Sequence, residues 1–209
     1  MSKAYIFDMD GVLCDSEPFI AEAAIRMFKE TYGVDVKEAD FLPFVGAGEN
    51  RYIGGVAEKY GIALDLERDK AETYRLYGEC VKGKLQALPG VKTFIKKAKA
   101  DGILLAVATS ADEVKLKTNL HEMGLDETLF DALVNGLEIE HKKPAPDIFI
   151  EAARRLGVDS VEATVFEDAI NGVQAAKAAG AHCVGITSSF SVGELLSAGA
   201  DETRDGFEC

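Results

Sequence analysis

The sequence predicts an α/β protein in which a parallel β-sheet is covered by helices on both faces, with a small helical insert after the first strand. Short apolar segments rich in β-branched residues are typical of buried parallel strands. Segments with helical periodicity alternate with most of them, which favours helices on both faces of one sheet. The predicted strands are residues 4–7, 103–108, 132–134, 163–166 and 183–186.

The stretch between the first two predicted strands breaks this alternation, because it has helical periodicity and no convincing strand. Its helices could simply cover one face of the sheet, but a direct crossover between parallel strands rarely needs so many residues. We therefore expect a core domain of residues 1–14 and 86–209, and a helical insert of residues 15–85 hinged near both of its ends. The apolar stripes that predict its helices are Ile20, Ala24, Met27 and Phe28; Ile53, Val56, Ala57 and Tyr60; and Tyr74, Tyr77 and Val81.

The helices that follow the insert resemble ordinary sheet-covering helices. Leu88-Pro89-Gly90 precedes one at residues 91–100, and apolar residues share one helical face within 149–156. A further helix begins near Ile170 and ends at Gly180, a residue that commonly terminates helices. In a sheet of this kind the binding site lies at the carboxyl ends of the strands.

The charge balance excludes some partners. The chain has 23 Lys and Arg against 36 Asp and Glu, a formal net charge of −13, whereas nucleic acids and anionic membranes are bound through basic patches. The four cysteines form no C-x-x-C pair and indicate reduced thiols. With no signal-peptide profile and no apolar run long enough to cross a membrane, we expect a cytoplasmic monomer whose partner is a small molecule.

Polar residues at the ends of the predicted strands indicate the chemistry. Asp8 and Asp10 follow the first strand, Thr109-Ser110 the second, and Glu167-Asp168 the fourth, while Lys143 lies in the loop after the third. Each has an ordinary explanation alone: a lone Asp-x-Asp is weak evidence, a hydroxyl often caps a helix, acids suit a helix start, and most lysines are solvated. Their occurrence together at one sheet edge is hard to explain in that way.

Together these groups favour a metal-dependent reaction on a phosphate. Acids that would repel one another are tolerated around a divalent cation, and oxygen-only ligands indicate magnesium rather than zinc. The lysine and the hydroxyls, Thr109 and Ser110, would then be free to hold a phosphate, and a carboxylate beside them could attack phosphorus. The expected cofactor is therefore Mg²⁺, and the expected partner is a small phosphorylated metabolite.

At this point the sequence resembles a known family. Residues 7–16 (FDMDGVLCDS), 108–110 (ATS), 143–149 (KPAPDIF) and 166–168 (FED) are similar to the four motifs of the haloacid dehalogenase-like hydrolases. They are most similar to the β-phosphoglucomutase-like branch, which carries a helical cap after the first strand. The resemblance covers essentially the whole chain and implies a Rossmann-like core, magnesium dependence and phosphoryl transfer through an aspartyl-phosphate.

The resemblance also implies a role for each motif residue. It makes Asp8 the nucleophile and Asp10 the general acid and base, with Thr109 and Lys143 holding the phosphoryl oxygens. Magnesium would be bound by the carboxylates of Asp8 and Asp168 and by the backbone carbonyl of Asp10, with Glu167 in or next to that shell.

A glycine-containing segment, residues 46–51 (GAGENR), opens a helix of the insert. It lacks the third glycine of a dinucleotide-binding loop and follows no predicted strand. The resemblance implies instead a substrate-facing loop, in which Glu49, Asn50 and Arg51 would contact the substrate.

Four alternatives remain beside the phosphatase. Sugar phosphomutases of this branch carry a histidine and an arginine at positions that align with Ile20 and Glu49, so a mutase would need Arg51 to compensate. A dehalogenase of this fold needs neither Asp10 nor a metal at Asp168. A receiver domain would be shorter and would lack the insert. A non-catalytic protein on this scaffold would be expected to have lost one of the motif residues. We therefore expect a magnesium-dependent phosphatase for a sugar or polyol phosphate, with the mutase as the main alternative.

Overall fold

The computed structural model describes residues 2–45 and 48–208 and contains one six-stranded sheet. The strands are β1 (Ala4–Phe7), β2 (Leu104–Ala108), β3 (Ala132–Val134), β4 (Ala163–Glu167), β5 (His182–Ile186) and β6 (Glu202–Arg204). Their order is β3-β2-β1-β4-β5-β6, and every neighbouring pair is parallel. β1 lies between β2 and β4, with Phe7 opposite both Val107 and Phe166. The predicted Rossmann-like parallel sheet is confirmed.

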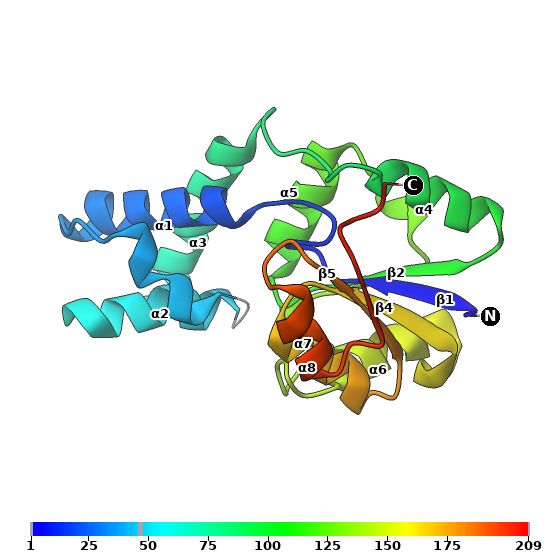
Figure 1. Ribbon diagram of the computed structural model, residues 1–209. Helices are drawn as coiled ribbons and strands as arrows, with labels where there is room; N and C mark the ends of the chain where they lie inside the picture. The colour runs from blue at the N-terminus through cyan, green and yellow to red at the C-terminus, as the bar shows by residue number, and fades with distance from the viewer. Residues whose placement is uncertain (1, 46–47, 209) are drawn as a thin grey trace.

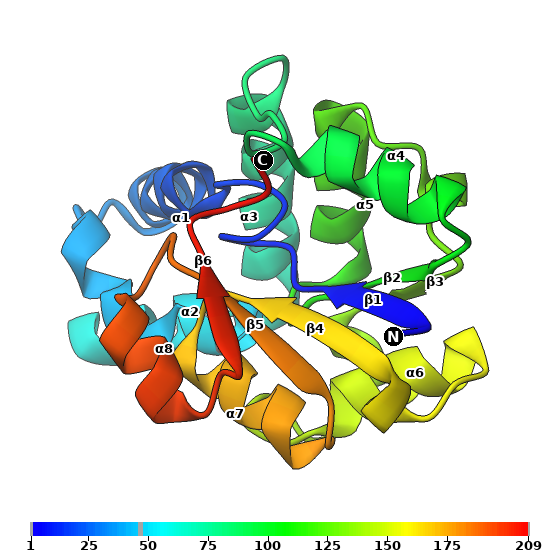
Figure 2. The same ribbon diagram turned by 45° about the vertical axis from the view of Figure 1, so that its right-hand side comes forward.

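β6, at one edge of the sheet, was not predicted from the sequence. Its three residues, Glu202, Thr203 and Arg204, are polar and largely exposed, so they lack the apolar run that predicts a buried strand. An edge strand needs a partner on one side only, and β6 pairs with β5 through the backbone. Figure 2 shows β6 beside β5, with the C-terminal segment rising from it across the sheet.

Helices cover both faces of the sheet. The helices α4 (Val91–Ala100) and α5 (Glu113–Met123) lie on one face, whereas α6 (Asp147–Leu156), α7 (Ile170–Ala178) and α8 (Val192–Ala198) lie on the other (Figures 1 and 2). Alternate residues of β1 point to opposite faces, as the strand period of two requires. Phe7 packs into the cluster that contains α4 and α5, and Ile6 into the cluster beneath α6 and α7.

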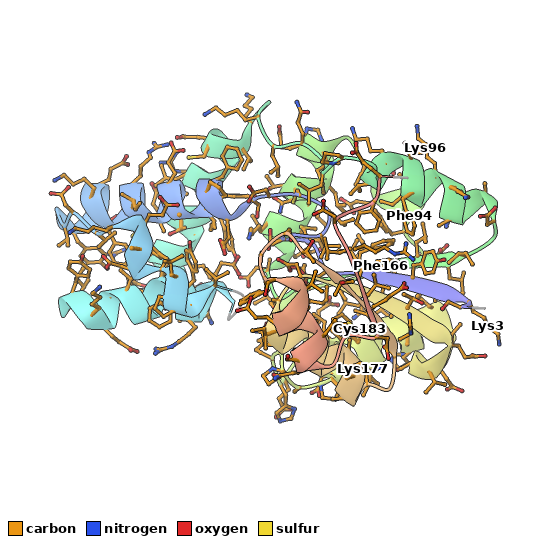
Figure 3. The ribbon with its side chains drawn as sticks, viewed as in Figure 1. Lys3, Phe94, Lys96, Phe166, Lys177 and Cys183 are labelled. Atoms are coloured by element: carbon orange, nitrogen blue, oxygen red, sulfur yellow. The ribbon has the colours of Figure 1, made fainter. Side chains whose placement is uncertain are left out.

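An aromatic cluster fixes the C-terminal segment to the first of these faces. Phe94 of α4 and Phe166 of β4, both labelled in Figure 3, have ring centroids 5.4 Å apart. The ring of Phe207 is tilted by 52° to both of these rings, and its centroid lies 4.8 Å from that of Phe94 and 5.3 Å from that of Phe166. Phe207 thereby packs into the apolar cluster between α4 and the sheet.

Among the described residues, three α-helices lie between β1 and α4: α1 (Glu17–Tyr32), α2 (Glu49–Tyr60) and α3 (Leu66–Val81). Two short 3-10 helices, Glu38–Asp40 and Leu42–Phe44, lie between α1 and α2. Figure 1 shows the three α-helices grouped beyond the end toward which β1 runs. Apolar residues of all three belong to the same buried cluster as the α4 and α5 face, so the hydrophobic contact is continuous from these helices to the sheet layer. Among the described residues, no helix is long and apolar enough to cross a membrane.

The cysteines that the structure describes, Cys14, Cys80 and Cys183, are free and buried, in keeping with reduced thiols. Cys209 lies outside the described residues.

Candidate active site

A cavity of about 390 Å³ lies at the carboxyl ends of β1, β2 and β4. The sheet side of its lining includes Asp8, Asp10, Thr109, Lys143 and Asp168, and the helices before α4 contribute its opposite wall. The residues of that wall are Glu17, Ile20, Leu42, Phe44, Val45, Gly48, Glu49 and Tyr52. The polar residues predicted at the carboxyl ends of the strands therefore line one cavity.

Lys143 joins two of the strand-end acids. Its Nζ lies 2.5 Å from Oδ1 of Asp8 and 2.6 Å from Oε1 of Glu167, and all three side chains are almost completely buried. Burial raises the pKa of Asp8 to about 7, the charge of Lys143 opposes that rise, and Glu167 adds to it. Burial also works against the charge of Lys143, but the two carboxylates keep its pKa above the ordinary value. The lysine thus stays charged inside the protein.

Three carboxylates form a compact cluster beside this lysine. Asp8, Glu167 and Asp168 are buried, and each offers an oxygen within 4.8 Å of the oxygens of the other two. Burial, and then the charges of Glu167 and Asp8, raise the pKa of Asp168 well above its ordinary value. Such repulsion is what a divalent cation relieves, and carboxylate oxygens are ligands that Mg²⁺ accepts. The donor set therefore fits a hard divalent cation.

Gly11 and Gly172 have no side chain, and the carboxylates of Asp168 and Glu167 occupy the space that a Cβ atom would fill. A Cβ on Gly11, whose φ is +74°, would be 1.9 Å from Oδ2 of Asp168. A Cβ on Gly172, in the first turn of α7, would be 1.8 Å from Oε1 of Glu167. Any side chain at either position would therefore displace a carboxylate of the cluster.

Asp10 is held apart from the cluster. One of its carboxylate oxygens accepts a hydrogen bond from the Ser16 hydroxyl, and Oδ2 lies 2.9 Å from Nζ of Lys115. Lys115, on α5, is 3% exposed. Although burial opposes its charge, Asp10 and Glu49 raise its pKa well above the ordinary value. Asp8 and Asp10 are two residues apart, yet their carboxylates pair with different cations, Lys143 and Lys115.

The hydroxyl groups predicted to contact phosphate are also at the sheet edge. Thr109 is 1% exposed, and its Oγ1 accepts a hydrogen bond of 3.1 Å from the backbone N–H of Ala111. Ser110 lines the cavity beside it. The structure therefore brings Asp8, Asp10, Thr109, Ser110, Lys143, Glu167 and Asp168 together, as their positions in the sequence predicted.

The three residues predicted from the loop before α2 are separated by the structure. Glu49 lines the cavity and is 6% exposed. Asn50 and Arg51 are exposed and, among the described residues, are not part of the cavity lining. Arg51 forms an ion pair of 2.8 Å with Glu58 and lies 5.0 Å from the ring centroid of Phe44. Gly46 and Ala47 of this loop lie outside the described residues.

Several polar residues in or next to the cavity were not predicted from the sequence. Ser189 follows β5, lines the cavity and donates its hydroxyl to Oδ2 of Asp168. Its neighbour Ser188, outside the cavity lining, donates to the backbone carbonyl of Gly11 at 2.5 Å and lies 3.4 Å from the same Oδ2. The rule that identified Thr109, a hydroxyl at a strand end, would have found them. No comparable signal marks Lys115 or Glu17, because nothing in a helical pattern shows which polar residue faces a distant cavity.

Comparison with known proteins agrees with this geometry. The family model described as haloacid dehalogenase-like hydrolase matches residues 5–186. The protein SUPPRESSOR OF QUENCHING 1, chloroplastic, of Arabidopsis thaliana is 41% identical over 206 residues, which are 97% of this chain but only 19% of that protein's length. The phosphorylated carbohydrates phosphatase of Thermotoga maritima is 35% identical over 200 residues, which are 95% of this chain and 92% of the relative.

A solved structure of a CbbY mutant from Rhodobacter sphaeroides, in complex with xylulose-(1,5)bisphosphate, superposes with a TM-score of 0.88 at 27% identity. The superposition covers 99% of this chain and 95% of the other. The family model covers most of the chain, and the four motifs meet in one cavity. The chain therefore belongs to the haloacid dehalogenase-like hydrolases, as its motifs predicted.

Proposed function

We propose that the protein is a magnesium-dependent phosphatase that hydrolyses a small sugar or polyol phosphate through an aspartyl-phosphate on Asp8. The observation that carries the proposal is the separation of the two acids of the first motif. Asp8 lies in the carboxylate cluster and against Lys143, whereas Asp10 is directed to Ser16 and Lys115. A nucleophile and a proton donor need different surroundings of this kind.

The first chemical step forms the bond between Asp8 and phosphorus. A carboxylate oxygen of Asp8 attacks, the bond from phosphorus to the ester oxygen breaks, and Asp10 gives its proton to that leaving oxygen. Lys143 and Thr109 hold the phosphoryl oxygens, where negative charge gathers in the transition state. The second step reverses the proton transfer, because Asp10 takes a proton from the water that attacks the phosphoryl group. Inorganic phosphate leaves and Asp8 is free again.

Asp8, Glu167 and Asp168 are the carboxylates that would hold magnesium. When bound, the ion supplies positive charge that offsets the charge of the phosphoryl group and of the three carboxylates. Lys143 supplies a second positive charge on the same side of the cavity.

We also propose that the insert, residues 15–85, acts as a cap over this site. Its residues form the wall of the cavity that faces the sheet edge. A substrate that reaches Asp8 must pass between this wall and the strand ends, so the cap should open for binding and close for the reaction.

Phosphate release from p-nitrophenyl phosphate tests the activity. Wild-type protein with magnesium should release phosphate, and the Asp8→Asn variant should not. A screen of phosphorylated sugars and polyols with the same two proteins then identifies the substrate. If wild type and Asp8→Asn release phosphate equally with every compound, the proposal is wrong.

The alternative, a sugar phosphomutase, differs in what receives the phosphoryl group. Ile20 and Glu49 both line the cavity, and neither side chain carries the positive charge that would bind a second phosphate. Glucose 1-phosphate with catalytic glucose 1,6-bisphosphate distinguishes the two reactions. A phosphatase accumulates inorganic phosphate, whereas a mutase accumulates glucose 6-phosphate faster than phosphate.

A further inference from the structure

Two acidic residues of the insert line the cavity near Lys115 and are not members of the metal cluster. Glu17 begins α1 and Glu49 begins α2, and both line the cavity. In each, Oε2 is buried and has no hydrogen-bond partner among the described residues. We call Glu17 and Glu49, together with Lys115, the acidic end of the cavity.

Lys115 fixes the position of Glu49 relative to the catalytic acid. Its Nζ lies 3.8 Å from Oε1 of Glu49 and 2.9 Å from Oδ2 of Asp10. The same Nζ lies 5.8 Å from the centroid of the Tyr77 ring. Oε1 of Glu49 thus has a cation beside it, and Oε2 remains an unused acceptor. The buried hydroxyl of Tyr74 likewise has no hydrogen-bond partner among the described residues.

The Oε2 atoms of Glu17 and Glu49, which have no hydrogen-bond partner among the described residues, favour a ligand that brings hydrogen-bond donors to this end of the cavity. A buried acceptor without a partner is unfavourable, and more so when it is charged, so a donor that reaches it is favoured. Among the described residues, the carboxyl groups of Asp10 and Glu49 share one cation here, Lys115. Glu17 is a third carboxyl group, whose pKa burial raises to about 7. A second anionic group on the substrate would add repulsion to a region that is already negative.

We propose that Glu49, supported by Glu17, is a specificity-determining residue that accepts hydrogen bonds from the leaving group. The substrates are then monophosphates whose leaving group carries hydroxyl donors and no second negative charge. This inference rests on the proposed phosphatase function and narrows its substrate class. It also separates this chain from the similar CbbY structure, whose bound sugar carries two phosphates.

The sharpest test uses substrates that differ at one group. Glucose 1-phosphate, glucuronic acid 1-phosphate and glucose 1,6-bisphosphate differ only at C6, where they carry a hydroxyl, a carboxylate and a phosphate. Glycerol 3-phosphate and 3-phosphoglycerate form a smaller pair that differs in the same way. For wild type we expect kcat/KM, measured as cleavage of the phosphate common to each set, to be at least about tenfold higher for the neutral member.

The Glu49→Gln variant keeps the size of the side chain and removes its charge. Its ratio of kcat/KM between neutral and acidic substrates should fall toward one, because the repulsion is lost and the acceptor is weakened. Glu58→Gln is the matched control, since Glu58 lies on the same helix and pairs with Arg51 outside the cavity. Its ratio should equal that of wild type.

Each outcome decides the inference. A wild-type preference for neutral substrates that Glu49→Gln removes and Glu58→Gln keeps supports it. Equal or better use of the acidic members, failure to cleave any neutral member while p-nitrophenyl phosphate is cleaved, or an unchanged ratio in Glu49→Gln overturns it and leaves the phosphatase function standing. A changed ratio in Glu58→Gln assigns the preference to Arg51 instead. Absence of magnesium-dependent cleavage of any compound, p-nitrophenyl phosphate included, overturns the proposed function and this inference with it.

Discussion

The Nζ of Lys143 lies 2.5 Å from Oδ1 of Asp8, although 135 positions separate the two residues. The same ammonium group contacts Glu167, so one buried cation serves carboxylates at the ends of two neighbouring strands. Lys143 therefore keeps a buried anionic partner, Glu167, when the charge of Asp8 is removed. A neutral residue at position 8 should then change the reaction without leaving a buried lysine unpaired.

We expect Asp8→Asn to abolish turnover without unfolding the protein. The amide has nearly the shape of the carboxylate, but it cannot form an acyl-phosphate, and Glu167 still neutralises Lys143. Asp10→Asn should be less severe and should lower kcat by about 10²–10⁴, as is usual for a general acid and base. Steady-state rates and thermal unfolding of both variants provide the measurement. Wild-type rates for Asp8→Asn would remove Asp8 from the mechanism.

Activity should be lost in EDTA and restored by magnesium. Calcium should restore it poorly, because its longer and looser coordination misplaces the nucleophile. Magnesium should also raise the melting temperature, since it binds the folded protein and relieves repulsion within Asp8, Glu167 and Asp168. Thermal scans with EDTA, magnesium or calcium test both statements. Full turnover in EDTA would leave this cluster without its proposed role.

The Gly172→Ala variant should weaken magnesium dependence specifically. The added Cβ would lie 1.8 Å from Oε1 of Glu167, so this carboxylate has to move away from Lys143 and from the cluster. We expect the magnesium concentration for half-maximal activity to rise about 10–100-fold, as when a group that orients a metal ligand is lost. Gly78→Ala, on α3 with no neighbouring atom within 4 Å of the new Cβ, is the control and should behave as wild type. Equal magnesium requirements in the two variants would contradict the prediction.

Residues 15–85 should become more protected from hydrogen exchange when magnesium and aluminium fluoride bind together. The anion takes the place of the phosphoryl group, and a closed cap shields its own amides. Exchange measured by mass spectrometry gives the result for each segment, with α6 as an internal reference because none of its residues lines the cavity. If protection of the insert does not change, the helices form a fixed cover and not a moving cap.

Stability of the metal-free protein should fall as the pH rises from about 4.5 to 7. Burial raises the pKa of Glu17 to about 7, from 4.5 in an unfolded chain. The folded state therefore keeps a proton that the unfolded state has lost, and the stability gained below pH 4.5 disappears as the pH passes through 7. Glu17→Gln should remove this contribution, on the order of 2–3 kcal/mol between pH 4.5 and 8. Urea unfolding in EDTA at the two pH values measures it, and identical pH dependence in wild type and variant would show that Glu17 is not the group.

The strand-end groups could be predicted from the sequence because their convergence follows from topology. Parallel strands bring their carboxyl ends to one edge, so the polar residues that follow them meet there whatever the details of packing. The same argument applies to Ser188 and Ser189, which were not predicted from the sequence. It fails for β6, whose polar residues pair through the backbone alone.

The acidic end of the cavity was decided by tertiary structure. Its members come from α1, α2 and α5, and a helical pattern shows which residues are apolar but not which polar side chain faces another segment. Packing of the insert against the core buries Glu49 beside Lys115 and turns Arg51 outward to Glu58, although the two residues are neighbours on one helix. The sequence by itself determined five of the six described strands, the motif residues and the kind of reaction. The surroundings of Asp10 and of the leaving group depend on how distant helices pack, and only the folded chain contains that information.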